Sequence, residues 1–97
     1  MMKEVVLTRE QYGKTRGPIA RYRRVNKALD ECGFTPYVPG PGWYHALTNS
    51  NIFPYQNSKH SYYNFEDMVA QSTDLDRTIS GEEEVIKEFI SVLDKVN

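Results

Sequence analysis

Two segments of this 97-residue chain carry apolar residues at helical spacing, and they constrain its fold more than any other feature of the sequence. Apolar residues three and four apart form one stripe along a helix, and other elements must cover that stripe. The first stripe consists of Ile19, Tyr22, Val25, Leu29 and Cys32, and the second of Val85, Ile86, Phe89, Ile90, Leu93 and Val96. The sequence therefore predicts helices over residues 18–32 and 81–96.

Residues at the ends of both segments fit helix boundaries. Pro18 suits a first helical turn, because its ring fixes φ there and its missing N–H costs no hydrogen bond. Gly33 suits the left-handed conformation that commonly ends a helix. Ser80 and Glu83 have the spacing of a capping box, in which each side chain accepts the backbone N–H of the other residue. We therefore expect this pair to start the second helix.

Three runs rich in β-branched and aromatic residues predict strands. The first covers residues 3–8. The other two, Phe34–Val38 and Trp43–Thr48, flank the turn-forming cluster Pro39-Gly40-Pro41-Gly42. Two such runs around a turn signal are typical of a β-hairpin.

The remaining segments are polar or rich in turn-forming residues. Residues 9–17 contain two glycines and are predicted to form a loop, and residues 49–63 to form a long, aromatic-rich loop. Asn64 can cap a brief helix over residues 65–71, since its side chain accepts a backbone N–H of the first turn. Residues 72–79 then form a polar connection.

The order β-α-β-β-α-α indicates an α+β fold with a three-stranded, mostly antiparallel sheet and about three helices. The length fits one domain over residues 1–97, and 39% hydrophobic with 26% charged residues is ordinary for a folded protein. No apolar run approaches the roughly 20 residues that cross a bilayer. Residues 1–4 lack the apolar stretch of a signal peptide. We therefore expect a cytoplasmic domain without a membrane partner.

The chain lacks the residue patterns of the common catalytic and metal sites. Cys32 is its one cysteine, so it can form no internal disulfide and no cysteine-based zinc cluster. His45 and His60 are its two histidines and belong to no metal-binding motif, and we interpret His45 as structural. The Gly13–Thr15 triplet lacks the earlier glycine of a phosphate loop. The sequence thus predicts a binding protein, not an enzyme, with no catalytic residues, metal or cofactor.

Charge is distributed unevenly, although the formal net charge is −1. Residues 1–31 hold eight basic and four acidic residues, and residues 65–97 hold three basic and nine acidic residues. Helix starts account for part of this acidic run, because negative charge is favourable there. The acidic residues that we interpret as a partner-binding surface are Glu66, Asp67, Asp74, Asp76, Glu82, Glu83, Glu84 and Glu88.

Carboxylates spaced along such a surface can imitate a nucleic-acid backbone. Glu84 and Glu88 lie one helical turn apart, which separates their Cβ atoms by about 5–6 Å and matches the length scale of neighbouring phosphates. A surface of this kind can enter a basic groove meant for DNA and compete with the nucleic acid there.

The basic residues of the first third allow two interpretations. They are Arg16, Arg21, Arg23, Arg24 and Lys27. They can bind phosphates, with nearby tyrosines available for base stacking, which would make the chain a small nucleic-acid-binding module. They can also form a solvated helix face or pair with the acidic half of the chain.

The chain resembles small phage-encoded anti-CRISPR proteins of the type I-F, DNA-mimicking kind. The resemblance consists of its length, its lack of catalytic motifs, its aromatic middle and its acidic run. The aromatic residues in question are Trp43, Tyr44, Phe53, Tyr55, Tyr62 and Tyr63, and the acidic run extends from Glu66 to Glu88. The resemblance covers the whole chain as general character, and no motif carries it. It implies an inhibitor in a bacterial host cell that binds a ribonucleoprotein surveillance complex with a basic DNA-binding groove. The resemblance also implies no direct nucleic-acid binding. The basic first third of the chain departs from the resemblance.

A further alternative is a Cas2/VapD-like ribonuclease of the ferredoxin-like type. The first strand, the first helix and the aromatic hairpin around Phe34, Tyr37, Trp43 and Tyr44 are similar to that family. The family places an aspartate after its first strand. Here Thr8 and Arg9 occupy that position, so the residue that would carry its chemistry is replaced.

Overall fold

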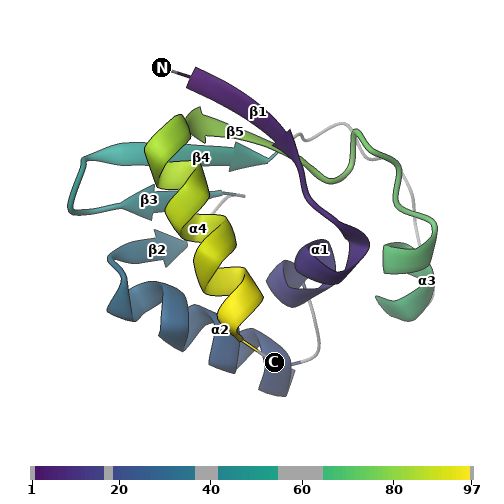
Figure 1. Cartoon of the computed structure of the whole chain (residues 1–97). Helices are drawn as coiled ribbons and strands as arrows, with labels where there is room; N and C mark the ends of the chain where they lie inside the picture. Colours follow the sequence, from purple (N-terminus) through teal and green to yellow (C-terminus); the bar gives the residue numbers. More distant parts are fainter. Residues whose placement is uncertain (1, 17–18, 37–41, 55–64, 97) are drawn as a thin grey trace.

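A computed structural model describes residues 2–16, 19–36, 42–54 and 65–96 of the chain. These residues contain five strands and four helices, which confirms the α+β class and corrects the predicted three strands and three helices. The strands are β1 Met2–Val6, β2 Phe34–Pro36, β3 Trp43–His45, β4 Ser50–Pro54 and β5 Thr78–Glu82. They form one antiparallel sheet in the order β1-β5-β4-β3-β2 (Figure 1). No helix among the described residues is long and apolar enough to span a membrane.

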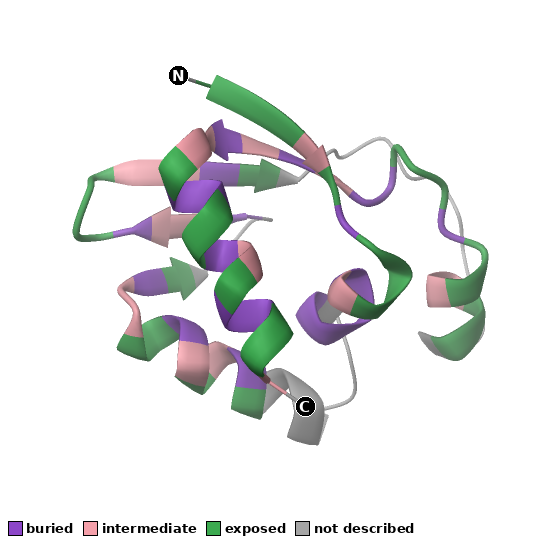
Figure 2. Cartoon of the chain, viewed as in Figure 1, coloured by how far each residue is buried: buried purple, intermediate pink, exposed green. Residues whose placement is uncertain are grey.

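The sheet buries one face, because its apolar side chains alternate with polar or exposed ones. The register places Val5 opposite Ile79 and Trp43 opposite Ile52, and directly opposed residues lie on the same face. Ile79 and Ile52 are both buried, and Figure 2 shows the alternation along β5. These two pairs therefore lie on the face of the sheet that is buried, which we call the inner face.

Helix α4 (Glu83–Lys95) lies across this inner face, and α2 (Ile19–Glu31) packs beside α4 and β2 (Figure 1). The buried side chains of α4 are Val85, Ile86, Phe89, Val92 and Leu93. The fully buried ring of Phe89 meets Phe34 edge-on, with 5.5 Å between ring centroids, and lies 4.7 Å from Trp43. Phe89 thereby joins α4 to both strands of the β2–β3 hairpin.

Both predicted long helices are confirmed, with small differences at their ends. The helix predicted over residues 18–32 is α2, although residue 18 lies outside the described residues, and the helix predicted over 81–96 is α4. Gly33 has a φ of 89°, and its N–H donates to the carbonyl oxygen of Asp30 at 3.0 Å. It ends α2 in the left-handed conformation that the sequence predicted.

The predicted capping box at the start of α4 is wrong. Ser80 lies in β5, paired with β1 and β4, and its hydroxyl donates to the carbonyl oxygen of Phe53 at 3.4 Å. The residue that precedes α4 is Glu82, whose side chain makes no capping hydrogen bond. Strand pairing holds Ser80 in the sheet, so it is not available to the helix.

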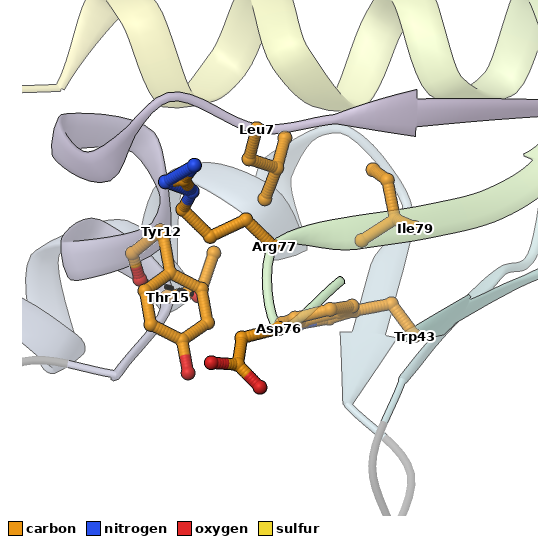
Figure 3. A pocket seen from close by; sticks show the side chains of 7 residues that line it. All are labelled: Leu7, Tyr12, Thr15, Trp43, Asp76, Arg77 and Ile79. Carbon is orange, nitrogen blue, oxygen red and sulfur yellow. Dashed lines mark hydrogen bonds between the residues drawn. The ribbon is translucent and has the colours of Figure 1, made fainter. Parts of the chain in front are cut away.

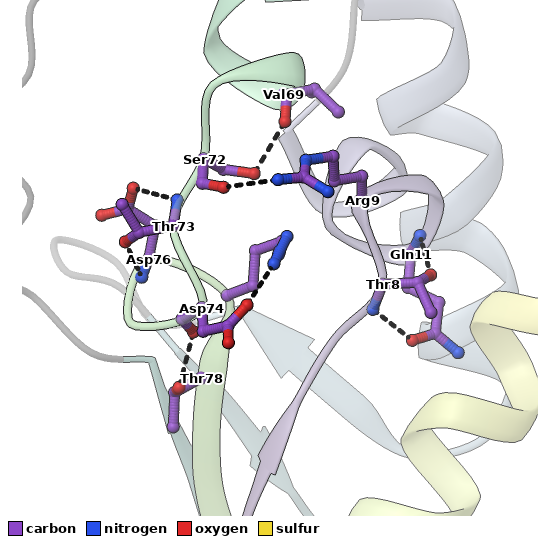
Figure 4. A network of polar contacts seen from close by, with 10 residues as sticks. Thr8, Arg9, Gln11, Val69, Ser72, Thr73, Asp74, Asp76 and Thr78 are labelled. Carbon is purple, nitrogen blue, oxygen red and sulfur yellow. Dashed lines mark hydrogen bonds and ion pairs between the residues drawn. The ribbon is translucent and has the colours of Figure 1, made fainter.

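A true capping box lies in a segment predicted to be a loop. Residues Arg9–Arg16 form helix α1. The N–H of Thr8 donates to Oε1 of Gln11 at 2.9 Å, and the N–H of Gln11 donates to Oγ1 of Thr8 at 3.1 Å (Figure 4). This reciprocal pair satisfies two backbone donors at the helix start. It outweighs the helix-weakening effect of Gly13, which led us to expect a loop.

Two strands lie where the sequence predicted loops. The predicted loop 49–63 contains β4, which follows a tight turn that ends at Asn49 with a φ of 52°. The predicted connection 72–79 runs into β5, which pairs with both β1 and β4. Gly81 permits this pairing, because a Cβ there would lie 2.8 Å from the carbonyl oxygen of Asn51.

The hairpin of β2 and β3 and the brief helix α3 (Phe65–Ala70) are confirmed, with β3 shorter than predicted. The turn residues 39–41, the loop beyond residue 54 and the expected cap at Asn64 lie outside the described residues. The ribonuclease alternative relied on the first strand, the first helix and the aromatic hairpin, and a ferredoxin-like fold arranges such elements in a split β-α-β unit, in which one strand separates the two strands that a helix connects. Here β1 and β2 lie at opposite edges of the sheet, with three strands between them.

Replacing Phe89 by alanine should destabilise the fold by about 3–5 kcal/mol, because it removes a fully buried ring and leaves a cavity beside Phe34 and Trp43. Urea unfolding followed by circular dichroism measures the change. The exposed Ser91 on the same helix is the control, and its alanine variant should change stability by less than about 0.5 kcal/mol. Equal effects of both variants would contradict this account of the core.

Candidate functional site

The eight carboxylates predicted to form one acidic surface lie in three parts of the molecule. Glu66 and Asp67 are exposed on α3, and Asp74 and Asp76 lie in the turn that leads into β5. The other four lie at the end of β5 and in the first half of α4, and they are Glu82, Glu83, Glu84 and Glu88. Helix α3 and the start of α4 are at opposite ends of the molecule in Figure 1. The structure therefore does not bring all eight residues onto one patch.

Asp76 is held inside its turn. The residue is 8% exposed, and its Oδ2 accepts the N–H of Thr73 at 2.9 Å. In return, the N–H of Asp76 donates to Oγ1 of Thr73 at 3.1 Å (Figure 4). This is the hydrogen-bond pattern of a capping box, here closing a turn instead of starting a helix. The expectation that Asp76 lies on an open acidic surface is thus wrong.

Asp74 is exposed, but it is paired with a buried cation. Its Oδ1 accepts from the guanidinium of Arg77 at 2.7 Å, and Arg77 is 6% exposed. The carbonyl oxygen of Asp74 also accepts the hydroxyl of Thr78 at 2.8 Å. Asp74 therefore helps to hold Arg77 and the start of β5 in place, which is a structural task.

Two of the four carboxylates at the β5–α4 junction are paired with exposed lysines. The side chain of Glu83 lies 3.6 Å from Nζ of Lys3 and 3.7 Å from Nζ of Lys87, and Glu84 lies 3.5 Å from the same Lys87. Both lysine side chains are more than half exposed, and exposed ion pairs contribute little and are screened by salt. We call Glu82, Glu83, Glu84 and Glu88 the junction carboxylates.

His45 has a structural position, as its place in an aromatic strand suggested. It is 2% exposed, with Nδ1 2.7 Å from Oγ1 of Thr48 and Nε2 3.1 Å from the carbonyl oxygen of Cys32. A carbonyl only accepts, so Nε2 carries a proton, and in the neutral ring Nδ1 then accepts from Thr48. Nε2 also lies 3.5 Å from Oε2 of Glu88, which ties one junction carboxylate to the core.

The basic residues of the first third are only partly described. Arg24 and Lys27 are exposed on α2, while the side chains of Arg16, Arg21 and Arg23 lie outside the described part of the structure.

Sequence reasoning missed a cluster of buried polar residues beside α1. Each residue of this cluster is at least nine-tenths buried, and its members are Lys14, Thr15, Asp76 and Arg77. Such burial is rare for the three charged members unless they are paired. Nζ of Lys14 donates to the carbonyl oxygen of Leu93 at 2.8 Å and so satisfies an acceptor in the last turn of α4. The capping box that starts α1 was the one signal in the sequence that this segment is ordered.

A small hollow opens between α1, β3 and the turn before β5, and we call it the Trp43 hollow. Its empty volume, open mouth included, is about 220 Å³. It is lined by Leu7, Tyr12, Thr15, Trp43, Asp76, Arg77 and Ile79. In Figure 3 the carboxylate of Asp76 and the hydroxyl of Tyr12 point to the same side, whereas the guanidinium of Arg77 lies on the side of Leu7. The hollow thus has a polar side and a mostly apolar interior.

The size of the Trp43 hollow limits what it can hold. Pockets for small-molecule ligands usually measure about 300–1,000 Å³, and the 220 Å³ of this hollow includes the open solvent at its mouth, so the hollow is too small for a ligand of that kind. Among the described residues, no group of three or more His, Cys, Asp and Glu side chains is arranged to hold a metal ion. Comparisons with protein-family models, with curated proteins and with solved structures each found no match.

Replacing Asp76 by alanine should lower the free energy of unfolding by about 1–2 kcal/mol, because the N–H of Thr73 loses its acceptor in the turn. Thermal and urea unfolding measure the change. The exposed Glu66 is the matched control, and its alanine variant should change stability by less than about 0.5 kcal/mol. A neutral effect at Asp76 would show that the turn does not depend on its carboxylate.

Proposed function

We propose that this protein is a stoichiometric inhibitor of the anti-CRISPR kind, which uses the junction carboxylates to occupy a basic DNA-binding groove on its partner. The partner class is a protein or ribonucleoprotein that holds DNA with lysines and arginines. The observation that carries this proposal is the presence of Glu82, Glu83, Glu84 and Glu88 within seven consecutive positions, at the end of β5 and in the first half of α4. The lysines near Glu83 and Glu84 are the exposed Lys3 and Lys87.

The geometry of α4 supports contact with a row of basic side chains. Glu84 and Glu88 are one turn apart on a regular helix, so their Cβ atoms lie about 5–6 Å from each other. The carboxylate of Glu84 is 86% exposed and that of Glu88 is 44% exposed, so both remain accessible despite their neighbours. Complementary charge of this kind speeds association and competes with phosphates for the same cations.

This proposal uses fewer residues than the sequence suggested. Asp76 is buried, Asp74 is paired with Arg77, and Glu66 and Asp67 lie on α3, away from the junction. The contact surface is therefore assigned to the junction carboxylates alone. The exposed Arg24 and Lys27 are on α2, so a groove that receives the start of α4 need not meet them.

The isosteric double variant Glu84→Gln/Glu88→Gln should weaken inhibition about tenfold at low salt, because two charges are lost with little change in shape. The measurement is the displacement of target DNA from a type I-F surveillance complex by increasing amounts of the protein. The difference from the unaltered protein should shrink as salt is raised, because salt screens exposed charges.

The matched control is Glu66→Gln/Asp67→Asn, which removes the same two charges from α3. It should inhibit like the unaltered protein if the junction carboxylates make the contact. Equal loss of inhibition in both double variants would show that the effect depends on net charge alone. If the unaltered protein displaced no DNA, this partner would be ruled out. A gel shift of DNA or RNA by the protein alone would instead favour the nucleic-acid-binding alternative.

A further inference from the structure

We propose that the open edge of β1 is a docking site for an extended segment of a partner protein, which adds to the sheet as a further strand. The segment carries a basic residue between two apolar residues at alternate positions of its chain. The inference goes beyond the proposed function and does not depend on it, because it uses Glu4 and the backbone of β1 instead of the junction carboxylates.

Strand β1 is the longer of the two open edges of the sheet. The strand order β1-β5-β4-β3-β2 leaves β1 and β2 as the edge strands (Figure 1). β2 has three residues and ends at Pro36, which has no N–H to donate, whereas β1 has five residues and no proline. Most of β1 is exposed, as Figure 2 shows. An edge of this kind is a template for pairing with another chain.

The backbone of β1 directs hydrogen-bonding groups toward this open edge. The N–H of Leu7 donates to the carbonyl oxygen of Arg77 at 2.8 Å, which continues the β1–β5 register by one residue. In an antiparallel pair, residues that bond to the neighbouring strand alternate with residues that do not. Leu7 and every second residue before it therefore bond to β5. The intervening residues direct their N–H and C=O groups to the open edge, and they are Met2, Glu4 and Val6.

The side chains of these three edge residues lie on the outer face of the sheet. Side chains alternate along a strand, and Val5 lies on the inner face, so its neighbours Glu4 and Val6 and the more distant Met2 lie on the other face. Met2 and Val6 are exposed large apolar residues, and Glu4 is exposed between them. An added strand places one side chain directly opposite each of the three. Apolar residues at the two outer positions would cover Met2 and Val6.

The charge of Glu4 selects a basic residue for the middle of the segment. On its paired side, Glu4 lies opposite the uncharged Ser80, and β5 contains no basic residue. The diagonal neighbours of Glu4 on the same face of β5 are Thr78 and Glu82. Opposite charges directly across a strand pair stabilise it, and like charges destabilise it. A lysine or arginine opposite Glu4 therefore stabilises the added strand.

The same charge disfavours a second copy of this chain as the occupant. When two β1 strands pair antiparallel around a two-fold axis, with all three edge residues of each matched, Met2 of one copy faces Val6 of the other. The Glu4 carboxylates of the two copies then lie directly opposite each other, which destabilises the pair. The structure thus favours a different chain, with the opposite charge at its centre.

The test uses a fluorescein-labelled peptide of sequence Thr-Val-Thr-Lys-Thr-Val-Thr with an amidated end. Its pattern of side chains is the same in both directions, so it matches β1 as a parallel or an antiparallel strand. Fluorescence anisotropy at low salt should show saturable binding to the unaltered protein. The peptide with glutamate in place of lysine should bind about fivefold more weakly, because it places a like charge opposite Glu4. Equal binding of the two peptides, or no binding, would overturn the proposal.

Amide hydrogen exchange shows whether the peptide adds as a strand. Saturation with the lysine peptide should slow exchange at the N–H groups of Glu4 and Val6 about tenfold, because these groups gain acceptors. The N–H groups of Lys3 and Val5 already bond to β5, so their exchange should slow less. Binding without slower exchange at Glu4 and Val6 would place the peptide elsewhere and refute the assignment.

Two charge-reversal variants locate the charge that the basic residue meets. Glu4→Lys should reverse the preference, so that the glutamate peptide binds more tightly than the lysine peptide. Glu66→Lys makes the same change of net charge on α3, and it should keep the preference of the unaltered protein. A Glu4→Lys protein that still prefers the lysine peptide would contradict the proposal, and the exchange experiment on the unaltered protein decides the matter if this variant fails to fold.

Sedimentation of the unaltered protein without peptide tests the other occupant. We expect a monomer, and a dimer that the lysine peptide dissociates would assign the edge of β1 to a second copy and overturn the proposal. Loss of DNA competition in the Glu84 and Glu88 variants would leave all of these outcomes untouched, since those residues lie in α4.

Discussion

The packing of Phe89 against the aromatic residues of the β2–β3 hairpin is the contact on which the rest of this structure depends. A sheet of five antiparallel strands buries one face only if a helix covers it, and α4 is the helix that crosses that face. Phe89 is fully buried at the centre of α4, where its ring meets Phe34 and Trp43. The position of α4 then fixes where its exposed carboxylates point and where the Trp43 hollow can form.

The region around α1 depends on polar contacts more than on apolar packing. Two capping-box pairs, Thr8 with Gln11 and Thr73 with Asp76, hold the start of α1 and the turn before β5. Lys14 connects α1 to the last turn of α4 through the carbonyl oxygen of Leu93. Buried polar groups of this kind are stable only when their partners are in place, so their positions are well defined. The same contacts bring Asp76 and Arg77 to the edge of the Trp43 hollow.

The distribution of charge along the sequence was a poor guide to the distribution of charge on the surface. Asp74 and Asp76 are two residues apart, yet one is exposed and paired with Arg77 while the other is held inside the turn. Glu66 and Glu84 both belong to the acidic run, but the helices that carry them are far apart in the fold. Sequence proximity fixes neighbouring charges only within one regular element, because turns redirect the chain between elements.

The sequence by itself determined the two long helices, the aromatic hairpin and the end of α2 at Gly33. These features rest on local causes, which are helical periodicity, turn-forming residues and the freedom of glycine at positive φ. Tertiary structure alone decided that β4 and β5 are strands, because a strand gains its hydrogen bonds from neighbours that lie elsewhere in the chain. It also decided the candidate sites. The burial of Asp76 and Arg77 and the position of the junction carboxylates depend on how the sheet, α1 and α4 meet, which no local pattern in the sequence encodes.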